Sequence, residues 1–313
     1  MVKRWLSYDK QVKLLQARGL TVTDTASATE FLSRVNYYRF SGYFRYWQVD
    51  PMAGNNHFLD GSSFEVIQRL YEAEQDLVAV CDEVLHPIEV LLRTRFAYYY
   101  AQRVGAIGKF ARGDGFTQSP DPNDKRVEEH ALSNLDRSKE TFVSHYRDEI
   151  KTGSAYSIEA YARMPIWVAV EAFSFGILSR LIEASSKSGV LHDMAASMNV
   201  SPTKLPSQVR SFVYLRNRNA HCAKLWNHAV LDRPGLPPNI ARRAKRDHRQ
   251  FSDHSIYKIF VALDQVATKT GLQKDWLANR VEPILATNAL LAAGIATPAR
   301  YGEMAPKLLA ADR

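Results

Sequence analysis

Apolar residues recur at the three- and four-residue spacing of α-helices along almost the whole chain. The clearest stretch follows Ser62 and Ser63, either of which can cap a helix that begins at Phe64. The apolar spacing continues to Leu85, and Pro87 is expected to kink or restart the helix. We see no segment with the strict alternation of a half-buried β-strand. The pattern therefore predicts an all-α fold.

Further helices are predicted from the same periodicity and from residues that favour helix ends, such as Gly19. Their predicted ranges are 8–18, 25–35, 88–104, 126–150, 166–175, 189–200, 206–227 and 255–268. Pro165 is expected at the first position of the 166–175 helix, which is almost wholly apolar and therefore predicted to be buried. Residues 50–61 are predicted to form a loop, and residues after about 290 a loosely held tail.

The composition is typical of a basic globular protein. The net charge of +8 and the isoelectric point of about 9.4 suit a polyanionic partner, although a solvated basic surface gives the same values. Cys81 and Cys222 form no CxxC or CxxH pattern, which argues against a zinc site and a disulfide framework. The chain has no apolar run of the roughly 20 residues that span a membrane, and no secretory h-region. We therefore expect a cytoplasmic protein with no membrane partner, metal or cofactor.

One short segment, Leu215 to Asn227, carries the residue types best suited to chemistry. Arg216, Asn217 and His221 lie within six residues of each other there. Arginine binds phosphate bidentately, and histidine moves protons near neutral pH. These groups can cleave RNA without a metal, because the ribose 2′-hydroxyl is the nucleophile. DNA lacks this hydroxyl and is not an expected substrate.

The expected roles follow from the side-chain chemistry. His221 is the general acid/base, Arg216 the contact to the phosphate in the transition state, and Asn217 the group that orients the imidazole. Five residues of a straight helix turn by about 140°, so Arg216 and His221 do not share a face. Either the helix ends or distorts between them, or the arginine of one protomer serves the histidine of another. We favour the second arrangement, which predicts a homodimer; ordinary structural hydrogen bonding remains an alternative for each residue.

Three further groups of residues accompany the Leu215–Asn227 segment. They are Gln11–Leu15 with Arg18–Leu20, Phe31–Leu32 and Asn36–Tyr43; Ile88–Glu89 with Arg93–Thr94 and Tyr98–Tyr99; and Pro165–Trp167 with Glu171, Ser174–Gly176 and Leu178–Ser179. Together the four groups resemble the AbiD/AbiF-type abortive-infection family of the HEPN superfamily, over most of residues 7–228. Arg216, Asn217 and His221 match the superfamily's Arg-polar-x3-His pattern.

The resemblance implies a HEPN-type up-and-down helical bundle at 61–270, with an insertion at 105–125 and a basic loop at 231–250. A small helical N-terminal module at 1–60 would precede the bundle, and a C-terminal helix and tail at 271–313 would follow it. The resemblance also implies a metal-independent endoribonuclease that acts in phage defence or as a toxin. Some members are associated with a small non-coding RNA. The rival interpretation is a non-catalytic RNA-binding protein in complex with such an RNA.

Other basic and aromatic side chains are candidates for contacting RNA. They are Arg218, Lys224, Arg39, Tyr38, Arg242, Arg243, Lys245 and Arg246. The aromatic residues among positions 37–47 equally suit packing of the N-terminal module, and the basic run suits a solvated loop. Glu89 and Arg93, four residues apart, are expected to form an intrahelical pair, and can also support the site arginine or RNA from a second layer.

Overall fold

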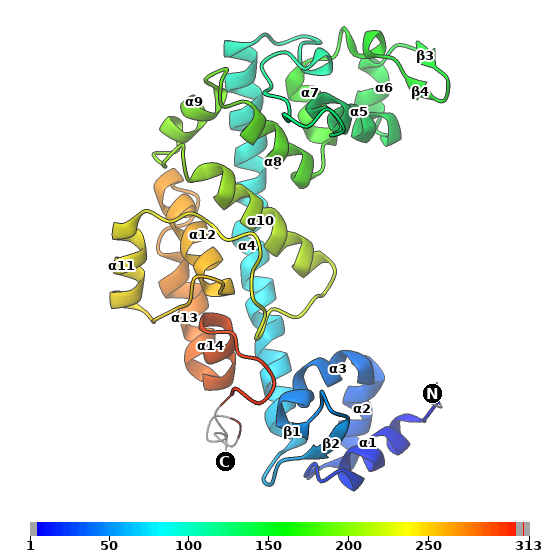
Figure 1. The fold of residues 1–313 in the computed structure, drawn as a ribbon, viewed down its shortest axis with the longest axis vertical. Helices are drawn as coiled ribbons and strands as arrows, with labels where there is room; N and C mark the ends of the chain where they lie inside the picture. Colours follow the sequence, from blue (N-terminus) through cyan, green and yellow to red (C-terminus); the bar gives the residue numbers. More distant parts are fainter. Residues whose placement is uncertain (1–4, 305–308, 310–313) are drawn as a thin grey trace.

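A single long helix forms the spine of the protein. The computed structural model describes residues 5–304 and residue 309, and helix α4 (Phe64–Arg103, 40 residues) runs most of its length (Figure 1). Ser63 caps α4 by accepting a hydrogen bond from the backbone N–H of Val66, as predicted. The helix continues through Pro87, so the predicted restart does not occur. Its neighbours Leu85 and Ile88 are fully buried, and their packing offsets the backbone hydrogen bond that proline removes.

The N-terminal module packs on the first turns of α4, at one end of the molecule (Figure 1). The helices predicted at 8–18 and 25–35 are confirmed to within one residue, but the predicted loop at 50–61 is partly wrong. A short antiparallel hairpin forms there, pairing Gln48 with Phe58 and Asp50 with Asn55. The elements are α1 (Tyr8–Ala17), α2 (Thr25–Arg34), α3 (Tyr37–Phe44), η1 (Arg45–Trp47), β1 (Gln48–Asp50) and β2 (Asn55–Phe58).

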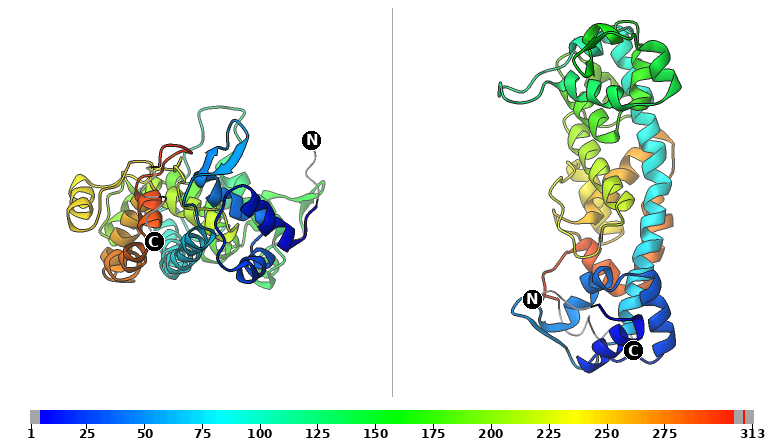
Figure 2. Two further views of the ribbon diagram at one scale, coloured as in Figure 1. Left: turned by 90° about the horizontal axis from the view of Figure 1, so that it is seen from below. Right: turned by 90° about the vertical axis from the view of Figure 1, so that its right-hand side faces the viewer.

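The opposite end of α4 carries a second group of short elements (Figure 2). The single helix predicted at 126–150 is wrong, because two shorter helices occupy this segment and a hairpin follows it. The helix predicted at 166–175 ends at Ala172, since Ser174 caps a new helix, and Pro165 is the cap of α7 rather than its first residue. The elements are η2 (Phe110–Arg112), α5 (Val127–Arg137), α6 (Thr141–Tyr146), β3 (Lys151–Thr152), β4 (Ala155–Tyr156), η3 (Ile158–Tyr161), α7 (Ile166–Ala172) and α8 (Phe175–Ala184).

Helices α10 and α12 pack against the middle of α4 (Figures 1 and 2). The basic segment 231–250 is not the loop that was predicted, because α11 forms within it. The prediction that residues after about 290 form a loosely held tail is also wrong for the first of these residues, since α14 buries Leu290, Leu291 and Ile295. The elements are α9 (Val190–Ser197), α10 (Leu205–Ala220), α11 (Pro238–Asp247), α12 (Ile256–Thr270), η4 (Leu277–Val281), α13 (Glu282–Thr287) and α14 (Ala289–Ala296).

The all-α prediction is confirmed: the described part of the chain contains fourteen α-helices and only two small two-stranded hairpins. One hydrophobic core extends from Val12 to Leu309 through all three predicted units, so their boundaries at 60 and 270 stay predictions. Within the described ranges, no helix is both long and apolar enough to cross a membrane.

A buried carboxylate joins α4 to the segment that follows α10. Glu74 is 1% exposed and accepts hydrogen bonds from the hydroxyl of Tyr43 and from the backbone N–H groups of Leu225 and Trp226, the last at 2.9 Å. Burial raises the pKa of this carboxyl, whereas its three donors favour the charged form. Glu74 therefore fixes both α3 and residues 225–226 relative to α4.

Lys224 also belongs to this arrangement. We name the group the Glu74 cluster (Tyr43, Glu74, Lys224 and Trp226). The Nζ of Lys224 donates to the carbonyl oxygen of Gly42 at 2.8 Å and lies 5.3 Å from the ring centre of Trp226. Burial lowers the pKa of Lys224 to about 8, and the nearby carboxylate of Glu74 opposes that change. The ring faces stabilise the desolvated ammonium. The N-terminal module is thus held against the chain immediately after α10.

Replacement of Glu74 by alanine should destabilise the protein by about 3 kcal/mol or more, because two buried N–H groups and the Tyr43 hydroxyl lose their partner and the Lys224 ammonium loses a nearby negative charge. Urea unfolding measures this change. Glu72→Ala, an exposed change on the same helix, is the matched control and should shift stability by less than about 0.5 kcal/mol. Equal unfolding midpoints for the two variants would contradict the importance of the cluster.

Candidate functional site

Helix α10 presents one polar face to solvent because its other side is anchored in the core. Val209, Phe212 and Leu215 are buried on that side. Asn219 adds a polar anchor, since its Nδ2 donates to Oδ1 of Asp82 on α4 at 2.9 Å. On the other side of α10, Arg210 and Asn217 are exposed.

The end of α10 differs from the prediction. The helix stops at Ala220 rather than at Asn227, and His221 is its C-terminal cap. The N–H of His221 donates to the carbonyl oxygen of Asn217 at 3.0 Å, so His221 lies one turn beyond Asn217. Cys222 then adopts a left-handed backbone conformation with φ of 49°, which ends the helix. The exposed His221 consequently occupies the tip of α10.

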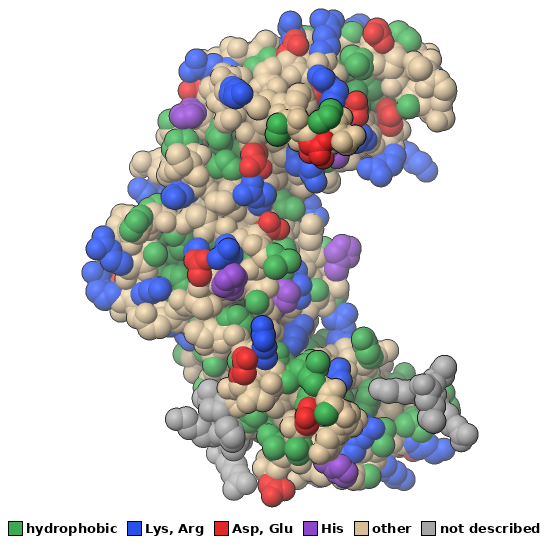
Figure 3. Space-filling view, viewed as in Figure 1, with side chains coloured by type: hydrophobic (Ala, Val, Ile, Leu, Met, Phe, Trp, Pro, Cys, Tyr) green, Lys and Arg blue, Asp and Glu red, His purple; other side chains and the backbone are tan. Residues whose placement is uncertain are grey.

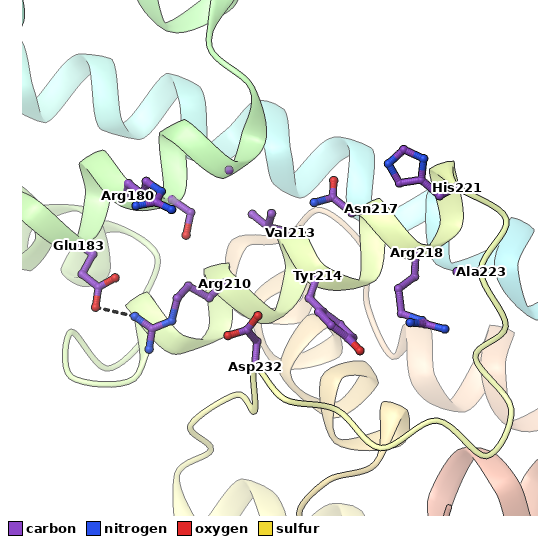
Figure 4. A pocket seen from close by; sticks show the side chains of 12 residues that line it. Arg180, Glu183, Arg210, Val213, Tyr214, Asn217, Arg218, His221, Ala223 and Asp232 are labelled. Atoms are coloured by element: carbon purple, nitrogen blue, oxygen red, sulfur yellow. Dashed lines mark hydrogen bonds and ion pairs between the residues drawn. The ribbon is translucent and has the colours of Figure 1, made fainter. Parts of the chain in front are cut away.

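A pocket of about 650 Å³ lies along this face of α10 (Figure 4). Asn217 and His221 lie side by side at one end of it, and Arg180 and Arg210 lie toward the other end. Arg210 pairs with Glu183 at 2.5 Å. Arg180 makes no ion pair within the described part of the chain. The full lining is Gly176, Ser179, Arg180, Glu183, Arg210, Val213, Tyr214, Asn217, Arg218, His221, Ala223 and Asp232.

Arg180, Arg210 and Tyr214, which precede the Leu215–Asn227 segment in the sequence, line the pocket but were not predicted as site residues. Arg210, Tyr214, Asn217 and His221 follow one another at spacings of four, three and four residues, which places them on one helix face. This spacing was the available signal for Arg210 and Tyr214. Arg180 lies on α8, and no local pattern connects it with α10.

Arg216 lies apart from this pocket and faces α4 and α8. Its Nε is 3.6 Å from Oε2 of Glu89, and its guanidinium lies 5.8 Å from the ring centre of Phe175. This separation agrees with the helix geometry that put Arg216 and His221 on different faces. The Nε atom is buried and makes no hydrogen bond among the residues described, and the Arg216 side chain is 34% exposed.

Glu89 also holds a second arginine. The predicted intrahelical pair of Glu89 and Arg93 is present, and Arg93 donates as well to the carbonyl oxygen of Val170 on α7. Both side chains of the pair are mostly buried. Glu89 therefore lies behind Arg216 and bears the only carboxylate that pairs with it among the described residues.

Three candidate RNA-binding residues have protein partners around the end of α10. Arg218 donates to the carbonyl oxygen of Lys224, and Arg39 of α3 donates to that of Cys222. The ammonium of Lys224 belongs to the Glu74 cluster. These contacts fix the turn beside His221, while RNA contact by the same residues stays a prediction.

The other RNA-binding candidates lie elsewhere on the surface. Tyr38 of α3 is 83% exposed. The basic residues of α11 form an exposed patch on the edge of the molecule opposite the end of α10 (Figures 1 and 3). Arg246 in this patch pairs with its neighbour Asp247 at 2.7 Å. The patch, which the structure does not bring to the pocket, is Arg242, Arg243, Lys245 and Arg246.

A second histidine, which the sequence did not single out, lies close to the site. A ring nitrogen of His228 contacts the hydroxyl of Tyr214. Burial, followed by the charges of Arg218 and Lys224, lowers the pKa of His228 to about 4. His228 is therefore neutral at pH 7, which suits a structural contact to Tyr214 better than proton donation.

Comparison with known proteins assigns the chain to a family. The model of the Abi-like protein family matches residues 30–227, which include α10 and the whole motif. No curated protein and no solved structure matches the chain. Because the family model covers more than half of the sequence, the chain belongs to the Abi-like protein family.

Proposed function

We propose that this protein is a metal-independent endoribonuclease that acts in abortive infection or as a toxin. Membership of the Abi-like family suggests an abortive-infection function. The main support for nuclease activity is the exposed His221, which lies beside Asn217 at the end of an arginine-lined pocket. No group of three or more His, Cys, Asp or Glu side chains suited to a metal ion occurs in the described part of the chain, which supports a reaction driven by protein side chains.

In the proposed reaction, His221 removes the proton of the ribose 2′-hydroxyl or protonates the departing 5′-oxygen. The 2′-oxygen forms a bond to phosphorus as the bond to the 5′-oxygen breaks. The products are a 2′,3′-cyclic phosphate and a 5′-hydroxyl. Asn217, one turn before His221, orients the imidazole, while Arg180 and Arg210 bind the RNA backbone along the pocket.

The remaining requirement is an arginine beside the reacting phosphate. The two terminal nitrogens of Arg216 make no hydrogen bond among the described residues, and its buried Nε lies farther from Glu89 than a hydrogen bond reaches, so the terminal donors stay available. Arg216 faces away from His221 of its own chain, so we propose that two protomers form an isologous dimer in which Arg216 of each serves the histidine of the other. Glu89 would hold this guanidinium in place.

RNA cleavage should proceed in EDTA and leave a 2′,3′-cyclic phosphate, and DNA should stay intact. His221→Ala should lower the cleavage rate by about 100-fold or more because the general acid/base is lost. His192→Ala, at another exposed histidine, is the matched control and should retain full activity. Mass spectrometry of the products and a gel-based rate measure both results. Dependence on Mg²⁺, or RNA binding without cleavage, would refute the nuclease assignment.

Mixing two inactive variants tests the shared site. Arg216→Ala and His221→Ala should each be inactive yet folded, since His221 is exposed and Glu89 keeps Arg93 as a partner. A mixed dimer would contain one site with both native residues, so mixing equal amounts should restore up to about a quarter of wild-type activity. Full activity of a wild-type monomer, shown by sedimentation at the assay concentration, would contradict the shared site.

A further inference from the structure

The N-terminal module contains a second polar pocket, whose lining shares no residue with the pocket along α10. Its volume is about 460 Å³, within the range of small-molecule sites. Residues of α1, α2, α3 and the β1–β2 hairpin contribute to its wall. The lining residues that matter for recognition are Arg18, Asn36, Tyr37, Tyr38, Arg45 and Gln48. Most belong to the N-terminal family signature, and the proposed cleavage chemistry does not use them.

The charged side chains that line this pocket are all positive. Its lining contains three arginines and no aspartate or glutamate. Arg34 is exposed and pairs with Glu30 at 3.3 Å, whereas Arg18 and Arg45 are half-buried and meet no carboxylate in the ranges that the structure describes. Among the described residues, Arg18 donates only to the hydroxyl of Tyr37 and Arg45 only to the carbonyl oxygen of Pro51, both at 3.3 Å, and the Arg45 guanidinium also lies 5.8 Å from the ring centre of Tyr301. Most of their donors therefore remain free for an anion.

The neutral groups of the pocket suit a nucleotide better than a simple anion. Tyr37 accepts a hydrogen bond from Arg18, and burial raises its pKa, so it retains a proton that it can donate to a phosphate oxygen. Tyr38 is 83% exposed at the rim, where a base can stack on its ring. Gln48 is only 4% exposed, and its Oε1 has no hydrogen-bond partner among the described residues, which leaves an acceptor for an amino group.

We propose that this pocket binds a nucleoside 5′-monophosphate group, with the phosphate on Arg18 and Arg45 and the base against Tyr38. The group is supplied either by a free nucleotide or by the phosphorylated 5′ end of an RNA. Helix α3 lines this pocket with Tyr37 and Tyr38, and contacts the turn beside His221 through Arg39. The binding site is nevertheless separate from the proposed nuclease site, and it stands whether or not the protein cleaves RNA.

Isothermal titration calorimetry on the full-length protein tests the proposal with 5′-AMP and adenosine as probes. A second pair of probes, 2′-O-methyl RNA decamers with a 5′-phosphate or a 5′-hydroxyl, resists cleavage because the nucleophile is blocked. The variants are Arg18→Gln and Tyr38→Ala, with Arg137→Gln on α5 as the matched control at an exposed arginine. Thermal unfolding verifies that each variant is folded. Tyr38→Ala decides the test if Arg18→Gln does not fold, because Tyr38 is almost fully exposed.

We expect the 5′-phosphate to strengthen binding about tenfold or more in at least one pair of probes. Arg18→Gln should abolish that gain, Tyr38→Ala should weaken binding about threefold or more, and Arg137→Gln should change nothing. A gain with 5′-AMP alone identifies a free nucleotide as the source, and a gain with the decamer alone identifies an RNA end. Equal binding with and without the phosphate in both pairs, a gain that survives in folded Arg18→Gln, or unchanged binding by folded Tyr38→Ala would overturn the proposal.

Discussion

The hydrogen bonds from residues 225 and 226 to Glu74 determine where α10 ends, and the position of His221 depends on that end. If α10 continued to Asn227, the backbone N–H groups of Leu225 and Trp226 would bond to carbonyl oxygens of the same helix. In the structure these groups bond to a carboxylate on α4 instead. Burying a charged carboxylate is costly unless every donor is in place. The cluster that satisfies Glu74 therefore stabilises the exposed helix tip.

The geometry of α10 then places the proposed general acid/base, His221, and the proposed phosphate contact, Arg216, on different sides of the helix. Residues at spacings of three and four form a face with Arg210, Tyr214, Asn217 and His221, and this face lines the pocket. Arg216 precedes Asn217 by one position, so it is turned by about 100° toward Glu89. In the structure Arg216 faces Glu89, whereas His221, the cap that follows Ala220, lines the pocket, so the two side chains of one chain do not face the same phosphate. The proposed roles therefore call for Arg216 and His221 of different protomers, as in the dimer that we propose.

Local signals predicted the starts of helices well and their ends poorly. Ser63 and Ser255 both cap the helices that follow them, because a side-chain oxygen needs only the next few N–H groups. The end of α10 depends instead on Glu74, which lies 151 residues earlier in the sequence than Leu225. For the site, the four-residue spacing that puts Asn217 and His221 on one side of α10 and the pairing of Glu89 with Arg93 were readable from sequence. Arg180 was not, since only tertiary packing brings α8 alongside α10.

The net charge of +8 does not by itself say where an anion can bind; that depends on which arginines are paired with a carboxylate. Arg103, Arg163 and Arg280 form close ion pairs with Asp193, Asp148 and Glu83, so their charges are largely neutralised at the surface. Arg18, Arg45 and Arg180 have no such partner in the described ranges, and all three line pockets. Unneutralised charge in a concave site attracts anions more strongly than the same charge on an open surface. Part of the excess positive charge is thus placed where a phosphate group can enter, at two separate positions of the fold.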